Sequence, residues 1–187
     1  MLFNHSSAIL LHPTSLPGPY GIGDLGPGAQ RWLDWQASTG TRWWQMLPLG
    51  PTGYADSPYA SFSAFAGNPM LISPELLEEQ GLLSAKDLSD HPYFPDHQVD
   101  FGAVNTWKER VLTQAFEAAQ QDQALMAAFA AFRNAEKDWL EDYALFMALK
   151  DQHEQRPWWQ WDSPLRNREA QALDAFRADP QRFHAVL

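Results

Sequence analysis

The sequence predicts an α/β fold that begins with a βαβ unit and continues as a mainly helical segment. Most of the prolines and the Gly-rich turns lie before residue 72, where they separate short apolar runs that suit strands. After residue 100 the chain is rich in Ala, Gln, Glu and Leu, with few breakers until Pro157. A strand, a helix and a strand within about 40 residues predict parallel strands joined by a right-handed crossover.

The first strand is expected to be short and buried, running from Ala8 to His12 and ended by Pro13. A loop rich in Pro and Gly follows, and the next helix is predicted over residues 27–38. Its first residue is a proline, which suits a first helical turn, and Gly40 ends it. The apolar side of this helix is expected to hold Trp32, Leu33 and Trp35.

The second strand is predicted within "TRWWQMLPL", with Trp43 and Trp44 on opposite sides of the sheet. The segment 48–69 leaves from the carboxyl end of this strand. In α/β proteins that end of a parallel sheet is where binding sites are built. The loop 48–69 is therefore the first place to look for function.

The remainder is expected to be helical. Start signals are a Ser cap with a following Pro at Ser73 and at Ser163, and an Asp-Pro pair at Asp179. We expect one division of the chain at residues 1–72 and 73–187. The predicted apolar helix faces are Trp107, Val111, Leu112 and Phe116, and then Trp139, Tyr143, Phe146 and Met147 within a run of about thirty residues without Gly or Pro.

The sequence also suggests that the chain is a part of a larger fold. Two parallel strands do not make a stable buried sheet, which needs more strands and cover on both faces. The helix that starts at Asp179 has few residues before Leu187 and no stop signal, and so short a helix is marginal by itself.

Charge and composition exclude several classes of partner. The net charge is −10 and the Lys and Arg residues are scattered, which disfavours nucleic acid and anionic membranes. The chain has no Cys, so disulfides and thiolate chemistry are excluded, and no pair of His has metal-ligand spacing. The N-terminus has no signal peptide pattern, and a soluble cytoplasmic protein is the default expectation.

The composition of the 48–69 loop matches the surface of a sugar. The loop contains no Lys, Arg, Glu or His, while Tyr54 and Tyr59 offer rings and Ser57, Ser61 and Ser63 offer hydroxyls. Sugars present CH faces that pack on rings, and hydroxyls that need donors and acceptors. Such a loop can equally serve only to cover a core, and composition leaves both interpretations open.

Three stretches of the sequence carry a family resemblance. "ILLHPTSLPGPYGIGDLG", "RWWQMLPLGPTGYADSPYASFSAFAGNPMLI" and "WLEDYALFMALK" resemble the amylomaltase family, the 4-α-glucanotransferases of the α-amylase-like clan. The resemblance implies a (β/α)8 TIM barrel, of which this chain holds the first two strands, with a large mainly α-helical insertion. It also implies transfer of α-1,4-glucan segments between maltooligosaccharides by retaining double displacement, without a metal or organic cofactor.

The resemblance also assigns expected substrate-binding residues. Tyr59 matches the family tyrosine that packs against the sugar ring beside the scissile bond, and Ser57 matches a position that touches donor-side sugar. Tyr54 matches a ring that binds glucan on an outer surface groove. At Phe101 some relatives have Tyr, so any glucan contact there would lack a phenol hydrogen bond.

No residue of this chain is expected to be catalytic. The resemblance implies that the family's three catalytic carboxylates lie beyond Leu187, so this chain alone is expected to be inactive. Asp24 and Asp56 lie in turns, where Asp commonly binds its own backbone, and His12 is expected to be structural. Two rival functions stay open, an α-amylase-type hydrolase and a non-catalytic glucan-binding module.

A cluster of tryptophans in "RPWWQWDSPLR" has two possible roles. Trp158, Trp159 and Trp161 could form an exposed sugar platform. We favour a plug that packs the helical insertion onto the barrel, because Trp dominates such contacts.

Overall fold

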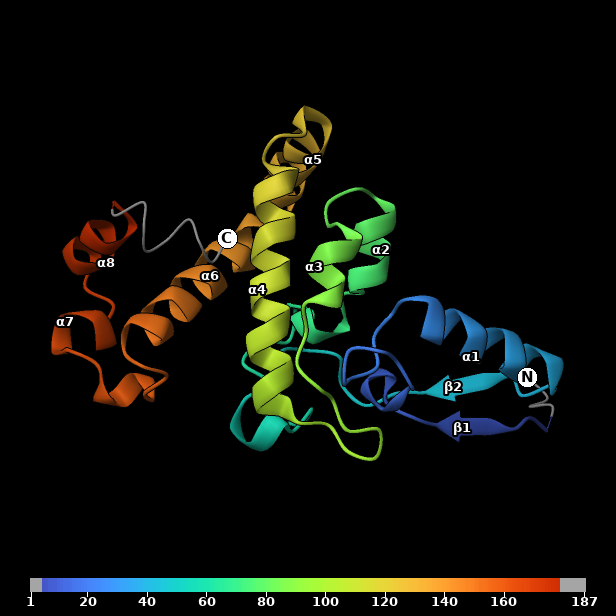
Figure 1. Ribbon diagram of the computed structural model, residues 1–187. Coiled ribbons are helices and arrows are strands. Elements are labelled where there is room, and N and C mark those ends of the chain that lie inside the picture. The colour runs from blue at the N-terminus through green and yellow to red at the C-terminus, as the bar shows by residue number, and fades with distance from the viewer. Residues whose placement is uncertain (1–4, 179–187) are drawn as a thin grey trace. The chain divides into compact units, whose positions relative to one another are not determined.

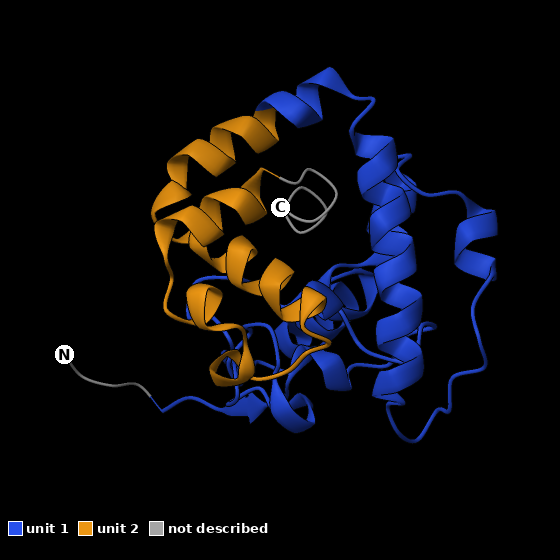
Figure 2. Ribbon diagram, turned by 90° about the vertical axis from the view of Figure 1, so that its left-hand side faces the viewer, with its two compact units in different colours: residues 1–127 blue, residues 128–187 orange. Residues whose placement is uncertain are grey.

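The computed structural model describes residues 5–178, and the chain divides into two compact units (Figure 2). Unit 1 is Met1–Ala127 and unit 2 is Ala128–Leu187. Helices dominate both units, and the strands found in the described residues lie in unit 1 (Figure 1). The division predicted from the sequence, 1–72 and 73–187, is of another kind, since it separates the expected part of a barrel from its expected insertion. That division stays a prediction.

Unit 1 opens with the βαβ unit that the sequence predicts (Figure 1). The strands β1 (Ala8–Leu10) and β2 (Trp43–Gln45) are parallel, and α1 (Pro27–Ser38) connects them. The helix has the predicted bounds, and Gly40 follows it in the left-handed region at φ 72°. The register pairs Ala8 with Trp43, Ile9 with Trp44 and Leu10 with Gln45.

The two strands are shorter and more open than predicted. β1 ends at Leu10 rather than at His12, and the side chains of Leu10 and Trp43 stay 56% and 62% exposed. The prediction of a buried first strand was therefore wrong. The reason is that α1 packs on one side of the pair, where the rings of Trp32 and Trp44 meet with centroids 6.1 Å apart.

The buried face of α1 also differs from the expected one. Leu33 and Trp35 are 44% and 49% exposed, while Ala29 and Gln36 are buried and Trp32 is half-buried. The i, i+3, i+7 spacing of Ala29, Trp32 and Gln36 places these residues on one side of the helix, the side turned away from solvent. Two of the three apolar residues expected on the inner side therefore lie toward solvent.

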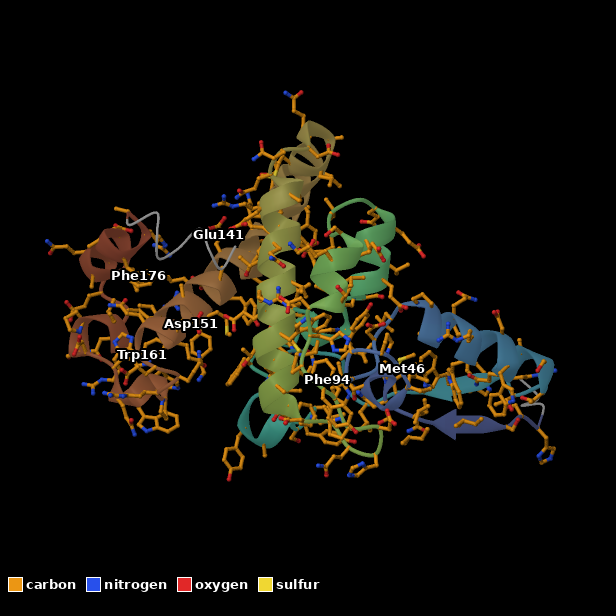
Figure 3. The ribbon with its side chains drawn as sticks, viewed as in Figure 1. Met46, Phe94, Glu141, Asp151, Trp161 and Phe176 are labelled. Carbon is orange, nitrogen blue, oxygen red and sulfur yellow. The ribbon has the colours of Figure 1, made fainter. Side chains whose placement is uncertain are left out.

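The core of unit 1 is built on the long helix α4 (Phe101–Ala119). The short helices α2 (Pro74–Glu79) and α3 (Ala85–Ser89) lie beside it (Figure 1). Of the predicted stripe, Trp107 and Val111 are buried. The core contains Tyr20, Ile22, Leu83, Leu88, Phe94, Val104, Trp107, Val111 and Ala115 (Phe94 is labelled in Figure 3).

Local capping only partly follows the predicted signals. Ser73 precedes α2, but its side chain makes no cap hydrogen bond to that helix. Ser84, in contrast, forms a capping box with Asp87 at the start of α3. Three 3₁₀ turns complete the described part of unit 1: η1 (Pro13–Ser15), η2 (Tyr54–Asp56) and η3 (Pro69–Leu71).

The long run without Gly or Pro forms two helices. These are α5 (Gln123–Ala135) and α6 (Lys137–Gln152), and they are separated at Glu136. Asp122 begins the run by accepting a hydrogen bond from the Ala124 N–H at 2.8 Å. The Glu136 carboxylate accepts one from the Trp139 indole N–H, so side-chain bonding marks a break that the sequence does not signal.

The core of unit 2 is centred on a face of α6 that was not predicted. Trp139, Tyr143, Phe146 and Met147 are only half-buried. Phe146 packs against the edge of the core, while neighbouring positions of α6 take the buried places. The core contains Ala144, Leu145, Ala148, Leu149, Trp161, Leu173 and Phe176 (Trp161 and Phe176 are labelled in Figure 3).

The end of unit 2 holds short elements. These are η4 (Trp158–Gln160), α7 (Ser163–Arg166) and α8 (Ala170–Arg177). The single helix expected from Ser163 is interrupted at Arg168, where φ is 57°, and Ser163 is its first helical residue rather than its cap. The helix expected from Asp179 lies outside the described residues.

Within residues 5–178, none of the helices has the length and apolar composition needed to cross a membrane.

Candidate functional site

The 48–69 loop is closed at its neck by backbone hydrogen bonds. The Asn68 N–H donates to the Leu49 carbonyl at 2.8 Å, and the Phe62 N–H donates to the Pro51 carbonyl at 3.3 Å. An antiparallel bridge pairs Thr52 with Ser61. The loop therefore folds back on itself as a short ribbon, and its side chains have defined positions although it contains no regular strand.

The tip of this loop is a strained turn. Ala55 and Asp56 have φ values of 56° and 53°, in the left-handed region that side chains other than Gly rarely adopt. Gly53 supplies the space that the turn needs, because a Cβ there would lie 2.5 Å from the Ala60 carbonyl oxygen. The conformation at the tip thus depends on the closed ribbon beneath it.

The serines of the loop bind mainly the backbone of the loop itself. The Ser63 hydroxyl accepts hydrogen bonds from the N–H groups of Phe65 and Ala66 at 3.1 and 3.0 Å. The Ser61 hydroxyl donates to the Ser63 carbonyl at 2.7 Å. The Ser57 hydroxyl accepts a long bond of 3.4 Å from the Tyr59 N–H. These hydroxyls stiffen the ribbon, and Ser57 keeps its O–H available as a donor.

Exposed rings are the main feature that the loop offers to solvent. The side chains of Tyr54, Tyr59 and Phe65 are 90%, 74% and 72% exposed. Tyr59 and Phe65 line one hollow of about 570 Å³, whereas Tyr54 is not part of its lining. The rest of the lining is neutral: Pro48, Leu49, Gly50, Pro58, Ser61, Ser63, Ala64, Ala66 and Gly67.

The three predicted substrate-binding residues do not lie together, and the ring of Phe65, which was not predicted, lines the same hollow as Tyr59. Tyr59 lies at the hollow, Ser57 lies in the turn before it, and Tyr54 lies outside the lining. Phe65 was missed because an apolar ring in a loop is usually a core residue. The sequence signal for Phe65 is a serine two residues earlier. The Ser63 hydroxyl accepts a hydrogen bond from the Phe65 N–H and so fixes the backbone of a turn at Phe65.

A smaller pocket of about 200 Å³ lies next to the loop, and more of its lining residues carry polar side chains. Its lining includes His12, Thr14, Asp56, Asn68 and Phe101. The His12 Nε2 donates to the Pro48 carbonyl at 3.3 Å, which leaves Nδ1 to pair with the Thr14 hydroxyl at 2.6 Å. Both ring nitrogens are thus satisfied, and the expectation that His12 is a structural residue stays a prediction.

The acids of unit 1 loops behave as turn residues. The Asp24 carboxylate accepts a hydrogen bond from the Gly26 N–H at 2.9 Å, as expected for Asp in a turn. Asp56 occupies the strained tip itself. Neither carboxylate lines the hollow beside Tyr59, so the expectation that these two residues are structural fits their positions.

The three tryptophans of the cluster in unit 2 differ in burial. Trp161 is buried, with its ring stacked on His153 at 5.1 Å and its N–H donating to the Arg156 carbonyl. Trp158 and Trp159 are 51% and 58% exposed. One ring therefore packs into the core of its own unit, and the expected contact with the barrel stays a prediction.

The chain has a helix-rich α/β fold with a neutral, ring-bearing loop after its second strand. Comparison with known proteins assigns a chain of this class to a family. The family model described as 4-alpha-glucanotransferase, glycoside hydrolase family 77, matches residues 11–187. The chain belongs to this family.

Individual relatives agree with the family match. The chain is 51% identical to a 4-alpha-glucanotransferase of Thermus thermophilus, over 95% of this chain and 36% of the relative. It is 47% identical to one of Synechocystis, over 92% of this chain and 35% of the relative. The structure matches the amylomaltase from Streptococcus agalactiae in complex with acarbose, with a TM-score of 0.91, 34% identity, and coverage of 98% of this chain and 37% of that chain. The chain thus spans about a third of the length of these proteins.

Proposed function

We propose that this chain is the glucan-holding N-terminal portion of a 4-alpha-glucanotransferase. Such an enzyme transfers a segment of an α-1,4-glucan to the 4-hydroxyl of an acceptor glucose or maltooligosaccharide. In this proposal β1 and β2 are the first two strands of a (β/α)8 barrel, and the loop 48–69 is a wall of its substrate groove. The observation that carries the proposal is the exposed Tyr59 ring in a hollow without charged side chains.

The chemistry of the family explains why a neutral aromatic wall is useful. Retaining transfer passes through a flattened, positively charged sugar, and two carboxylates flank the bond that breaks. The face of the Tyr59 ring can pack on the CH side of such a sugar and favours its positive charge. The carboxylates would come from residues other than those of this chain, which therefore supplies binding and orientation.

A second role of the loop is to favour transfer over hydrolysis. The glucosyl-enzyme intermediate must meet a sugar hydroxyl before it meets water. Tyr59 and Phe65 cover the hollow with apolar surface, and the Ser61 and Ser63 bonds keep the ribbon stiff. A stiff apolar wall loses little entropy when a glucan binds and leaves less room for water.

The direct test is titration of this chain with maltoheptaose in a calorimeter. Tyr59→Ala should weaken binding about tenfold, because ring packing on a sugar contributes on the order of 1 kcal/mol. Tyr93→Ala is the matched control, since Tyr93 is 84% exposed and lies outside the loop. Equal affinities of the wild type and the Tyr59 variant would remove the loop from the binding surface.

Maltotriose turnover tests whether this chain is active by itself. The chain alone should bind glucan without releasing glucose, because the proposed catalytic carboxylates lie elsewhere. Glucose release by this chain at the rate of a complete relative would overturn that part of the proposal.

A further inference from the structure

Lys108 is a fully buried cation at the centre of unit 1. It lies on α4 between Trp107 and Glu109, and its side chain is 0% exposed. Its ammonium donates hydrogen bonds to the carbonyl oxygens of Met70 and of Ile72, the latter at 2.8 Å. A buried ammonium is retained only where such acceptors replace its water.

The two carbonyl oxygens belong to the segment that directly follows the 48–69 loop. Met70 lies in the turn η3, and Asn68 caps that turn by accepting from the Met70 N–H at 2.9 Å. The Asn68 N–H in turn closes the neck of the loop on the Leu49 carbonyl. A short chain of hydrogen bonds therefore leads from the Lys108 ammonium to the neck of the aromatic loop.

A second segment is fixed to the same turn from the other side. The Asp24 Oδ2 atom lies 3.8 Å from the Lys108 ammonium, and the Leu25 N–H donates to the Leu71 carbonyl at 3.0 Å. Gly26 lets the segments approach, because a Cβ there would lie 2.1 Å from the Ser73 hydroxyl. The Asp24 turn thus holds η3 against α4.

The two charged groups compensate each other in this buried place. Burial lowers the pKa of Lys108 to about 8, and the nearby Asp24 carboxylate opposes that shift. Burial raises the pKa of Asp24, and the Lys108 ammonium is the main opposing influence. Each group is therefore more easily kept charged because the other is present.

We propose that Lys108 is a positioning residue for the 48–69 loop. Its ammonium fixes the carbonyl groups at the exit of the loop, and the fixed exit holds the ribbon that carries Tyr59 and Phe65. Any buried ammonium needs acceptors in place of water, and the backbone acceptors of Lys108 lie at the exit of the loop. The bonds to Met70 and Ile72 place the charge directly after the last residue of the loop.

The test is hydrogen exchange of the loop amides in the full chain, with Lys108→Met as the first variant. Met keeps most of the buried stem and removes the donors. We expect amides of residues 49–68 to exchange about tenfold faster or more, since their closed state depends on the exit turn. The amides of α6 in unit 2 should not change. The control is Lys86→Met, because Lys86 is an exposed lysine in the same unit.

A chemical rescue separates the charge from the packing. The chain has no Cys, so Lys108→Cys creates a single thiol that bromoethylamine converts, in the denatured chain, into a close lysine analogue. Refolded protein should regain slow exchange in the loop after aminoethylation and not before. Unchanged loop exchange in Lys108→Met, or a Cys variant protected without the amine, would overturn the proposal.

Two further outcomes would also count against it. A chain that folds only with the amine restored would assign Lys108 to the folding of unit 1 as a whole. Recovery of thermal stability without recovery of loop protection would do the same. The effect of the loop on glucan affinity rests on the proposed function, but loop exchange does not, so failure of maltoheptaose to bind the wild type would reject the proposed function alone.

Discussion

At the scale of single residues, unit 1 depends on one compensated pair of buried charges. Lys108 and Asp24 come from a helix and a turn far apart in sequence, and their Nζ and Oδ2 atoms are 3.8 Å apart. Backbone carbonyl groups complete the shell of the Lys108 ammonium, and hydrogen bonds from a charged donor are among the stronger ones. Burial lowers the pKa of Lys108 to about 8, so this group should lose its proton at a lower pH than an exposed lysine does.

The stability of the chain should show this pH response. Burial places the pKa of folded Lys108 at about 8, below its ordinary value of 10.5. Below pH 8 the group holds its proton in both states. Between about pH 8 and 10.5 the unfolded chain holds a proton that the folded chain has released, so this group's contribution to stability rises with pH.

Denaturant unfolding at pH 7 and pH 9.5 measures that contribution. Relative to Lys108→Met, the free energy of unfolding of the wild type should gain on the order of 1 kcal/mol at the higher pH. The other titrating groups are common to both chains and largely cancel in the difference. The assigned direction of the pKa shift would be contradicted if the wild type gained no unfolding free energy relative to Lys108→Met between pH 7 and pH 9.5, or lost some.

Residue types alone predicted part of the site. Tyr59 was predicted from its neutral loop and from the family resemblance, and its ring is exposed at a hollow, while both ring nitrogens of His12 are bonded. Lys108 was not found, because a lysine within a helix normally extends to solvent. Its partners at Met70 and Ile72 lie outside its helix, and no local pattern marks contacts across such a sequence separation.

At the scale of elements, the sequence predicts best where the signal is local. Pro27 and Gly40 bound α1 through backbone preferences of single residues, and the helix has the predicted limits. The strands were predicted too long, because their length depends on which neighbours pair with them. The break at Glu136 coincides with a bond from the Trp139 indole N–H to the Glu136 carboxylate, and no composition signal predicts it.

The loop 48–69 is the element whose shape can be tested most directly. Gly53→Ala should distort its tip, because the added Cβ would lie 2.5 Å from the Ala60 carbonyl oxygen. Maltoheptaose affinity should fall several-fold. Gly102→Ala is the control outside the loop, since a Cβ there would meet only the Asp100 carboxylate, at an ordinary contact distance of 3.4 Å. Equal losses in both variants would mean that the tip geometry has no special role.

At the scale of the whole molecule, the described residues form two units with separate cores. The core of unit 1 is built on α4, and the core of unit 2 is built on α6 and α8. Leu10 and Trp43 on the two-stranded sheet are exposed, and the chain spans about a third of the length of its relatives. The count of strands alone predicts further strands beside these two, and that expectation stays a prediction.

Separate cores predict separate consequences of core mutations. Leu145 is 1% exposed in the core of unit 2, so Leu145→Ala should lower the stability of that unit by about 2–5 kcal/mol. Hydrogen exchange should become faster in α6 and α8, while α4 and the loop 48–69 keep their protection and maltoheptaose affinity stays the same. Leu125→Ala, at a site 39% exposed, is the control and should change little. Loss of protection in the loop upon the Leu145 change would show that the two units unfold as one, and the loop would then draw its order from the whole chain rather than from α4 and the Asp24 turn.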